Sequence, residues 1–145
     1  MEMLFATDAY LSLLLVRVVL GIIFFAHGAQ KVLGWYGGHG LKGTVSFFAS
    51  MGMPVPVAYL VCLLEFLSGI GLLVGFLARL CGLAIAAIMV GAMATVHWKN
   101  GFFLNIELTP GKGHGIEFNL ALLAMALVVF LDGAGPLSID LMLTP

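Results

Sequence analysis

Charged residues are scarce in this sequence. Only 9% of the 145 residues are Asp, Glu, Lys or Arg, whereas 62% are hydrophobic. A soluble domain carries about 25% charged residues, so this chain cannot cover itself with a mainly water-facing surface. The net charge is −1, and no basic tail or patch is present. Nucleic acid is therefore excluded as an expected partner.

Motifs of several common catalytic and metal sites are also missing. The sequence has no Cys-x-x-Cys pair, no zinc-ligand spacing and no nucleophile elbow. The glycine-rich segment 37–40 lacks the Gly-Lys-Ser/Thr ending of a phosphate-binding loop. Haem ligation by His27 and His97 is disfavoured, because the first is predicted inside a helix and the second at a helix end. A metal held by these histidines and Glu65 is disfavoured as well.

Long apolar runs make up most of what is present. A membrane helix needs about 20 mostly apolar residues, and four stretches reach or approach that length: about 10–33, 57–77, 80–98 and 116–131. The fourth is the shortest. We therefore predict an all-α protein, with residues 1–145 forming a single membrane domain built as a four-helix transmembrane bundle.

The connections between these stretches differ in length. Residues around Ala78 and Arg79 form a short turn, which makes the second and third spans an antiparallel hairpin. The connections at 34–56 and 99–115 are longer. With four spans, both long loops lie on one side of the membrane and both chain ends on the other. Helical spacing of apolar residues predicts a short interfacial helix at 41–51.

The two cysteines, Cys62 and Cys81, are predicted to stay unbonded to each other. About 16 helical residues separate Cys62 from the turn near Ala78, which corresponds to a rise of about 24 Å. A disulfide needs Cα atoms within about 7 Å. We expect both cysteines to be small buried apolar residues.

Polar side chains gather at the long-loop end of the predicted bundle. Ionisable groups inside a membrane are costly unless paired or hydrated, so each is a functional candidate. His27 and Glu65 lie about 9–12 Å below the long-loop side by helical rise, so we predict that they share one pocket, in direct or single-water contact. The candidate ligand-binding or proton-handling residues are His27, Gln30, Lys31, Glu65, His97, Lys99 and Glu117.

Each candidate also has a structural interpretation. Glu65 would then be a protonated group that holds helices together, and Lys31 would extend its ammonium group to the membrane surface. Glu117 would interact favourably with a helix dipole, while His97 and Lys99 would be solvated at the interface.

Charges at the opposite end are interpreted as structural. They comprise Arg17, Arg79 and Asp132, and Arg17 is predicted to reach the membrane surface or to pair with Asp132. Two further histidines, His39 and His114, fall in glycine-rich loops and are expected to be solvated.

A series of short motifs runs through nearly the whole chain. They are Arg17-x3-Gly21, His27-Gly28-x2-Lys31, Gly34-Trp35, Phe47-Phe48, Gly52-x-Pro54, Glu65, Arg79, His97-x2-Asn100-Gly101-Phe102-Phe103, Glu117-Phe118, Asp132-Gly133 and Gly135-Pro136-Leu137-Ser138-Ile139-Asp140. In this combination the chain resembles the DoxX family of small bacterial and archaeal membrane proteins. The resemblance implies a prokaryotic inner (cytoplasmic) membrane location.

The resemblance also implies a link to membrane oxidoreductases. The family is named after a subunit associated with thiosulfate:quinone oxidoreductase and terminal quinol oxidase. A quinone site needs access to hydrocarbon and a few polar groups that hold carbonyl oxygens and pass protons. His27 or Lys31 would bond one oxygen and Glu65 would relay a proton. The aromatic residues expected to pack against the ring are Trp35, Phe47, Phe102 and Phe103.

The expected partners follow from this hypothesis. They are membrane lipids, a small amphipathic ligand such as a quinone, and a redox partner protein that supplies electrons or a second copy of the chain. Two alternatives stay open: a non-enzymatic binding or transport protein for a lipid or small solute, and a structural assembly subunit. The ligand, catalysis itself and membrane orientation are not determined by the sequence.

Overall fold

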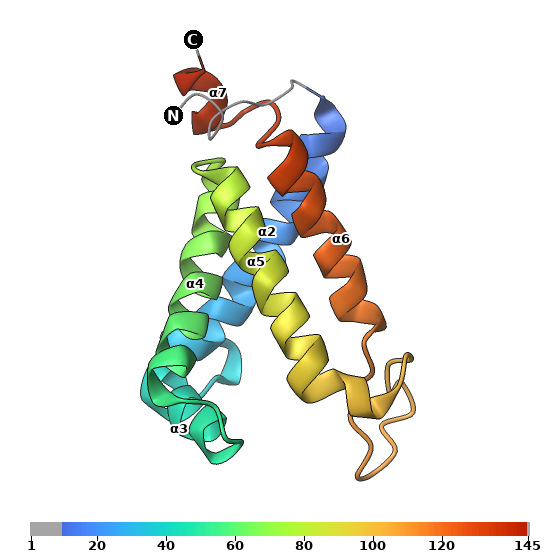
Figure 1. The fold of residues 1–145 in the computed structure, drawn as a ribbon. Helices are drawn as coiled ribbons and strands as arrows, with labels where there is room; N and C mark the ends of the chain where they lie inside the picture. The colour runs from blue at the N-terminus through green and yellow to red at the C-terminus, as the bar shows by residue number, and fades with distance from the viewer. Residues whose placement is uncertain (1–9, 145) are drawn as a thin grey trace.

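The computed structural model describes residues 10–144, and every regular element in that range is a helix. The four longest helices are α2 (Leu11–Val32), α4 (Val55–Val74), α5 (Ala78–Ala92) and α6 (Glu117–Asp132), which run alternately up and down (Figure 1). The shorter elements are η1 (Trp35–Gly37), α3 (Gly40–Ser50), η2 (Met93–His97), η3 (Trp98–Asn100) and α7 (Ile139–Leu143). The predicted all-α class is confirmed, and the arrangement is roughly that of a four-helix bundle.

Three helical stretches in the described part of the chain are long and apolar enough to cross a membrane. They are Leu11–Val32, Val55–Val74 and the continuous stretch Ala78–Asn100. The fourth long helix, α6, has 16 residues, a length of about 24 Å against about 30 Å for a hydrocarbon core. The number of membrane crossings therefore stays a prediction.

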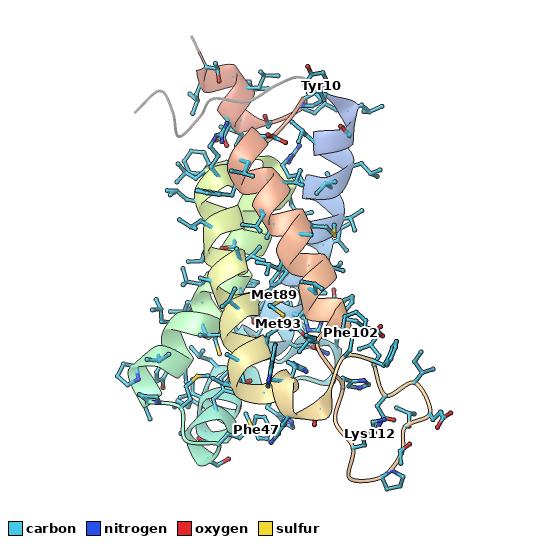
Figure 2. The ribbon with its side chains drawn as sticks, turned by 45° about the vertical axis from the view of Figure 1, so that its right-hand side comes forward. Tyr10, Phe47, Met89, Met93, Phe102 and Lys112 are labelled. Carbon is cyan, nitrogen blue, oxygen red and sulfur yellow. The ribbon has the colours of Figure 1, made fainter. Side chains whose placement is uncertain are left out.

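The two long connections lie at one end of the molecule. Figure 1 places α3 and the loop after η3 at this long-loop end, whereas the α4–α5 turn, the start of α2 and α7 lie at the opposite, terminal end. Figure 2 likewise separates Phe47, Phe102 and Lys112 from Tyr10. The helix expected at 41–51 is α3, one residue earlier at each end. Residues 1–9 and 145, which the predicted single domain includes, lie outside the described residues.

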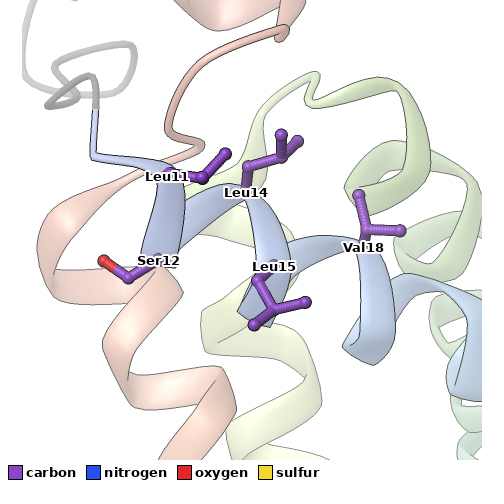
Figure 3. A pocket seen from close by; sticks show the side chains of 5 residues that line it. All are labelled: Leu11, Ser12, Leu14, Leu15 and Val18. Atoms are coloured by element: carbon purple, nitrogen blue, oxygen red, sulfur yellow. The ribbon is translucent and has the colours of Figure 1, made fainter.

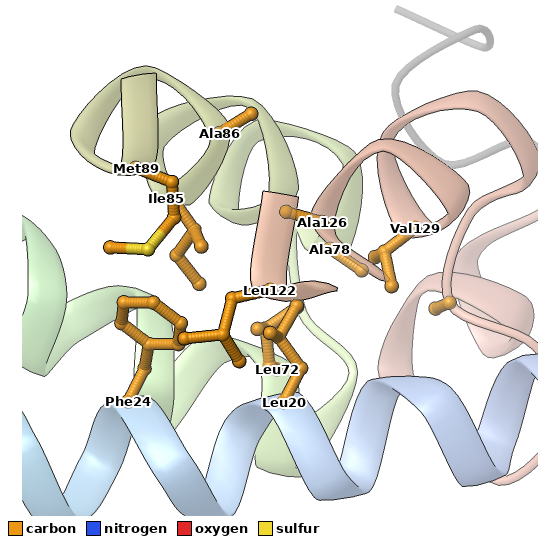
Figure 4. Packing of buried hydrophobic residues seen from close by; sticks show 11 residues of the cluster. Leu20, Phe24, Leu72, Ala78, Ile85, Ala86, Met89, Leu122, Ala126 and Val129 are labelled. Carbon is orange, nitrogen blue, oxygen red and sulfur yellow. The ribbon is translucent and has the colours of Figure 1, made fainter. Parts of the chain in front are cut away.

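The main apolar core lies between all four long helices. Its residues include Leu20 and Phe24 of α2 and Leu72 of α4, packed against a facing set on α5 and α6 (Figure 4). That facing set contains Ile85, Ala86, Met89, Leu122, Ala126 and Val129. A second cluster, between α3 and α4, contains Cys62. Both Cys62 and Cys81 are free, as predicted.

Two glycines allow α2 and α4 to approach closely. A Cβ atom added to Gly28 would lie 2.4 Å from the Cα of Phe66, and one added to Gly69 would lie 2.3 Å from the backbone nitrogen of Phe25. Small residues at a membrane helix interface let backbones come near each other and gain dispersion contacts. This crossing fixes the relative height of α2 and α4, and therefore of the polar groups that they carry.

Candidate functional site

Lys31 and Glu65 form a hydrogen-bonded salt bridge between α2 and α4. The Nζ atom of Lys31, in the last turn of α2, donates to Oε2 of Glu65, near the middle of α4. Only 6% of the Glu65 side chain is exposed, against 23% of the Lys31 side chain. A carboxylate in this position needs a partner, since ionised groups are strongly disfavoured in hydrocarbon. The pair is therefore the polar centre of the long-loop half of the protein.

His27 makes no direct hydrogen bond to Glu65. Glu65 bonds to Lys31 rather than directly to His27, and the imidazole is exposed on the surface of the single chain. The ring is nevertheless within electrostatic reach of both members of the pair. It follows Ile23 and Phe24 by one helical turn, on the face of α2 that packs against the main core. A water-mediated link to Glu65 stays a prediction.

His97 lies where α5 changes its winding. The five residues Met93–His97 form a turn of π-helix, an irregularity found frequently at functional sites. The Nδ1 atom of His97 is 2.9 Å from the carbonyl oxygen of His114. A carbonyl can only accept, so Nδ1 carries a proton, and in a neutral imidazole Nε2 would keep a lone pair that can accept a proton or a hydrogen bond. Lys99, two residues further, is exposed.

A hydrogen-bonded loop holds the carbonyl group of His114 in place. The buried amide of Asn105 donates to the carbonyl oxygens of Thr109 (3.1 Å) and Lys112 (2.7 Å), and the Asn105 backbone donates to Nδ1 of His114 (3.2 Å). Glu117 accepts from the backbone nitrogen of Leu104 at 2.8 Å. His114, expected to be solvated, is exposed, and its ring also accepts the bond from the Asn105 backbone. The sequence analysis also missed Asn105, although Asn in a glycine-rich loop typically bonds nearby backbone groups.

The other candidates at this end are spread over the surface. Gln30 donates to the carbonyl oxygen of Tyr36 at 3.3 Å and so ties the end of α2 to the following turn. All four predicted aromatic residues are exposed: Trp35, Phe47, Phe102 and Phe103. Trp35 meets Phe25 edge to face at 6.4 Å. Trp35 and Phe47 belong to the first long connection, and Phe102 and Phe103 belong to the second.

Arg17 is the most heavily bonded charge at the terminal end. It is fully buried, and its guanidinium group donates to five carbonyl oxygens, those of Leu72, Leu73, Ala134, Pro136 and Leu137. The expectation that it reaches the surface or pairs with Asp132 is wrong. Asp132 is exposed, and the five-donor fork of an arginine is instead matched by backbone acceptors.

Arg79 and Asp140 complete the structural charges. Arg79 donates to the carbonyl oxygens of Phe130 and Leu131 at the end of α6, where a cation favours the helix dipole. The carboxylate of Asp140 accepts from the backbone nitrogens of Leu77 and Ala78 at 2.8 Å each, which caps the start of α5. Asp140 was not singled out as a cap, because its target lies 62 residues away in sequence.

A hollow on the outer face of α2 is unrelated to these polar groups. It is lined by Leu11, Ser12, Leu14, Leu15 and Val18 (Figure 3). These residues occupy the first half of α2, whereas Lys31 lies in its last turn. The almost wholly apolar lining suits lipid chains and not the polar head of a ligand.

Sequence comparisons match this chain to known membrane proteins. The family model named DoxX matches residues 12–98, which contain Arg17, His27, Lys31, Glu65 and His97. A Bacillus subtilis protein named "Putative oxidoreductase CatD" is 34% identical over 127 residues, covering 88% of this chain and 83% of that protein. The Escherichia coli "Inner membrane protein YqjF" is 28% identical over 134 residues, covering 91% and 92% respectively. No solved structure gives a significant match.

Proposed function

Because this chain belongs to the DoxX family, we propose that it is the membrane subunit of a redox system and binds a quinone at its long-loop end. The observation that carries the proposal is the Lys31–Glu65 pair, which lies between two helices of membrane-spanning length. The name of the Bacillus subtilis relative supports the redox assignment. The name of the Escherichia coli relative supports an inner-membrane location.

The chemistry of the pair suits the reduction of a quinone. A quinone takes up two electrons and two protons to become a quinol, and negative charge develops on its carbonyl oxygens during the reaction. The Lys31 ammonium group can donate a hydrogen bond to one oxygen and stabilise that charge. Glu65, bonded to Lys31, can then carry protons to or from that oxygen. The electrons come from a redox partner protein.

His27 and His97 provide further polar groups at the same end. His27 stands one turn from Lys31 on α2, within electrostatic reach of the pair. In the neutral state, His97 has an Nε2 lone pair available because its Nδ1 atom is bonded to the loop. In this proposal either imidazole forms a hydrogen bond to the second quinone oxygen, and Trp35 or Phe102 packs against the quinone ring.

The test is identification of the molecule that purifies with the protein. The full chain is extracted from membranes in mild detergent, and bound lipids are separated and identified by mass spectrometry. We expect a near-stoichiometric quinone in the unmodified protein and its loss in Glu65→Gln and Lys31→Met. The matched controls are Asp132→Asn and Lys42→Met, which make the same charge changes at exposed positions.

Other outcomes would favour the alternative functions. A phospholipid or another solute retained in place of quinone, and lost in the same two variants, would indicate a non-redox binding protein. Equal quinone content in all five proteins would remove the Lys31–Glu65 pair from the binding site. A purely structural subunit would show changed thermal stability in the two site variants with no bound small molecule in any sample.

A further inference from the structure

The loop between η3 and α6, residues 101–116, exposes large apolar side chains while two of its polar side chains bond to the loop itself. Its polar side chains Asn105 and His114 bond to the loop's own backbone. Its apolar side chains point outward, and the exposed fractions are 72% for Phe103, 82% for Ile106 and 74% for Leu108. A loop in water has the opposite arrangement, since exposed apolar surface is costly and exposed amides are not. The outward side chains of Phe103, Ile106 and Leu108 therefore suit an apolar environment.

The heights of α5 and α6 place this loop within the thickness of the membrane. Arg79, near the start of α5, bonds the last carbonyl groups of α6, so these two helix ends are level. From that level the helical stretch Ala78–Asn100 continues for 23 residues, or about 34 Å, whereas α6 covers about 24 Å with its 16 residues. Part of the loop fills the remaining difference of about 10 Å beside the end of this stretch, and part extends past it (Figure 1).

We propose that the segment 101–108 of this loop is embedded in the lipid boundary region, where Phe103, Ile106 and Leu108 bind phospholipid acyl chains. The segment extends the lipid-facing surface of α5 past the short end of α6. Neighbouring Trp98 is 71% exposed, and aromatic side chains are enriched at this depth. Glu107 and Lys112 are also exposed, and at headgroup depth both keep contact with water.

Backbone hydrogen bonding is consistent with such a site. Irregular backbone is tolerated at membrane depth only where its polar groups are satisfied within the protein. Here the backbone nitrogens of Gly115, Ile116 and Glu117 donate to the carbonyl oxygens of residues 103, 101 and 102, at 3.0, 3.1 and 2.9 Å. Asn105 satisfies two more carbonyl groups. Within the segment 101–108, the carbonyl groups of residues 101–105 are thus bonded inside the protein.

Tryptophan fluorescence in vesicles tests the proposal. The two native tryptophans, Trp35 and Trp98, are replaced by Phe, and a single reporter is introduced as Phe103→Trp, Ile106→Trp or, as the control, Lys112→Trp. Each full-length protein is placed in phosphatidylcholine vesicles that are either unlabelled or brominated on the acyl chains near the headgroup. Circular dichroism verifies that each variant keeps its helical content.

The expected result is several-fold stronger quenching by brominated lipid at positions 103 and 106 than at Lys112→Trp. Quenching by aqueous acrylamide should show the reverse order. Two results would overturn the proposal. Equal access of acrylamide to all three reporters would place the loop in water. Protection from both quenchers at 103 and 106 would show that protein, such as a second copy of the chain, covers these side chains instead.

Discussion

The Lys31–Glu65 salt bridge makes each partner dependent on the other. Removing one member of a buried ion pair leaves an uncompensated charge and costs about 3–5 kcal/mol, whereas replacing both by apolar residues is often nearly neutral. We therefore expect Lys31→Met and Glu65→Leu each to lower the thermal unfolding temperature in detergent. The double variant should be more stable than either single variant.

The unfolding temperatures of the two single variants and the double variant separate the structural role of the salt bridge from its functional role. Additive losses in the double variant would mean that the two side chains do not interact in the folded protein. Asp132→Asn, at an exposed position, should leave the unfolding temperature nearly unchanged. A double variant that is stable but retains no quinone would satisfy both the structural account and the proposed function.

Arg17 should be more sensitive to substitution than any exposed cation of the chain. Its five carbonyl acceptors lose their donor in Arg17→Met, and unsatisfied buried polar groups cost about 1–3 kcal/mol each. We expect Arg17→Met to fold poorly and Arg17→Lys to be intermediate, because an ammonium group has only three donors. The yield of monodisperse protein in gel filtration measures this, with the exposed Lys42→Met as the control. Normal yield of Arg17→Met would contradict it.

The sequence predicts which polar residues lie inside the apolar stretches. It does not predict the hydrogen-bonding partner of each one. Scarce charges inside apolar runs indicated Lys31 and Glu65, which are half-buried and buried, whereas Arg17 was expected at the surface and is buried. Their partners depend on helix rotation and on the reach of long side chains. Glu65 therefore bonds Lys31 and not His27. Arg17 bonds backbone carbonyls, which no sequence pattern distinguishes because every residue has one.

At the scale of elements, the α2–α4 crossing depends on glycine at two positions. An alanine methyl at Gly28 or Gly69 would come within 2.4 Å or 2.3 Å of the opposite backbone, so the helices must move apart. Overpacking of this kind costs about 1–3 kcal/mol. We expect Gly28→Ala and Gly69→Ala to lower the unfolding temperature and to weaken quinone retention, since separation of the helices also separates Lys31 from Glu65.

A third glycine provides the matched control for this prediction. A Cβ atom on Gly91 of α5 would meet nothing within 4 Å, and alanine is the better helix former. Gly91→Ala should therefore be neutral or slightly stabilising by differential scanning fluorimetry. Equal destabilisation by all three substitutions would show that helix packing is not the cause.

The boundaries of the elements could be predicted wherever local rules decide them. Helices α2, α4 and α6 begin and end within a few residues of the predicted spans, and α3 was found from its helical spacing. The third span was predicted as regular helix up to residue 98. In the structure, regular α-helix ends at Ala92, and the chain then continues through the π-helical turn η2 and the 3-10 turn η3. Helix α7 was not predicted: its five residues begin at a local cap, in which Ser138 accepts from the backbone nitrogen of Leu141, and the Asp140 carboxylate ties the helix to the start of α5, 62 residues away in sequence.

For the whole molecule, the number of membrane crossings decides on which sides the two chain ends lie. If α6 crosses the membrane together with the three longer stretches, Tyr10 and α7 face the same compartment, as their shared end of the fold suggests (Figure 1). Reporter fusions at Met1 and Pro145 should therefore give signals from the same side. Signals from opposite sides would mean that α6 lies in one leaflet without crossing.

Several of the carbonyl groups that Arg17 binds come from the end of the chain, so its hydrogen bonds can be completed only late in synthesis. Arg17 enters the membrane with the first helix, yet three of its five acceptors belong to residues 134, 136 and 137, up to 120 positions later in the chain. Until the ribosome has delivered that last segment, the nascent protein carries an incompletely bonded guanidinium in the bilayer. Chains that stop before Ala134 therefore lack three of the five acceptors of Arg17, and their terminal end cannot pack as it does in the finished protein.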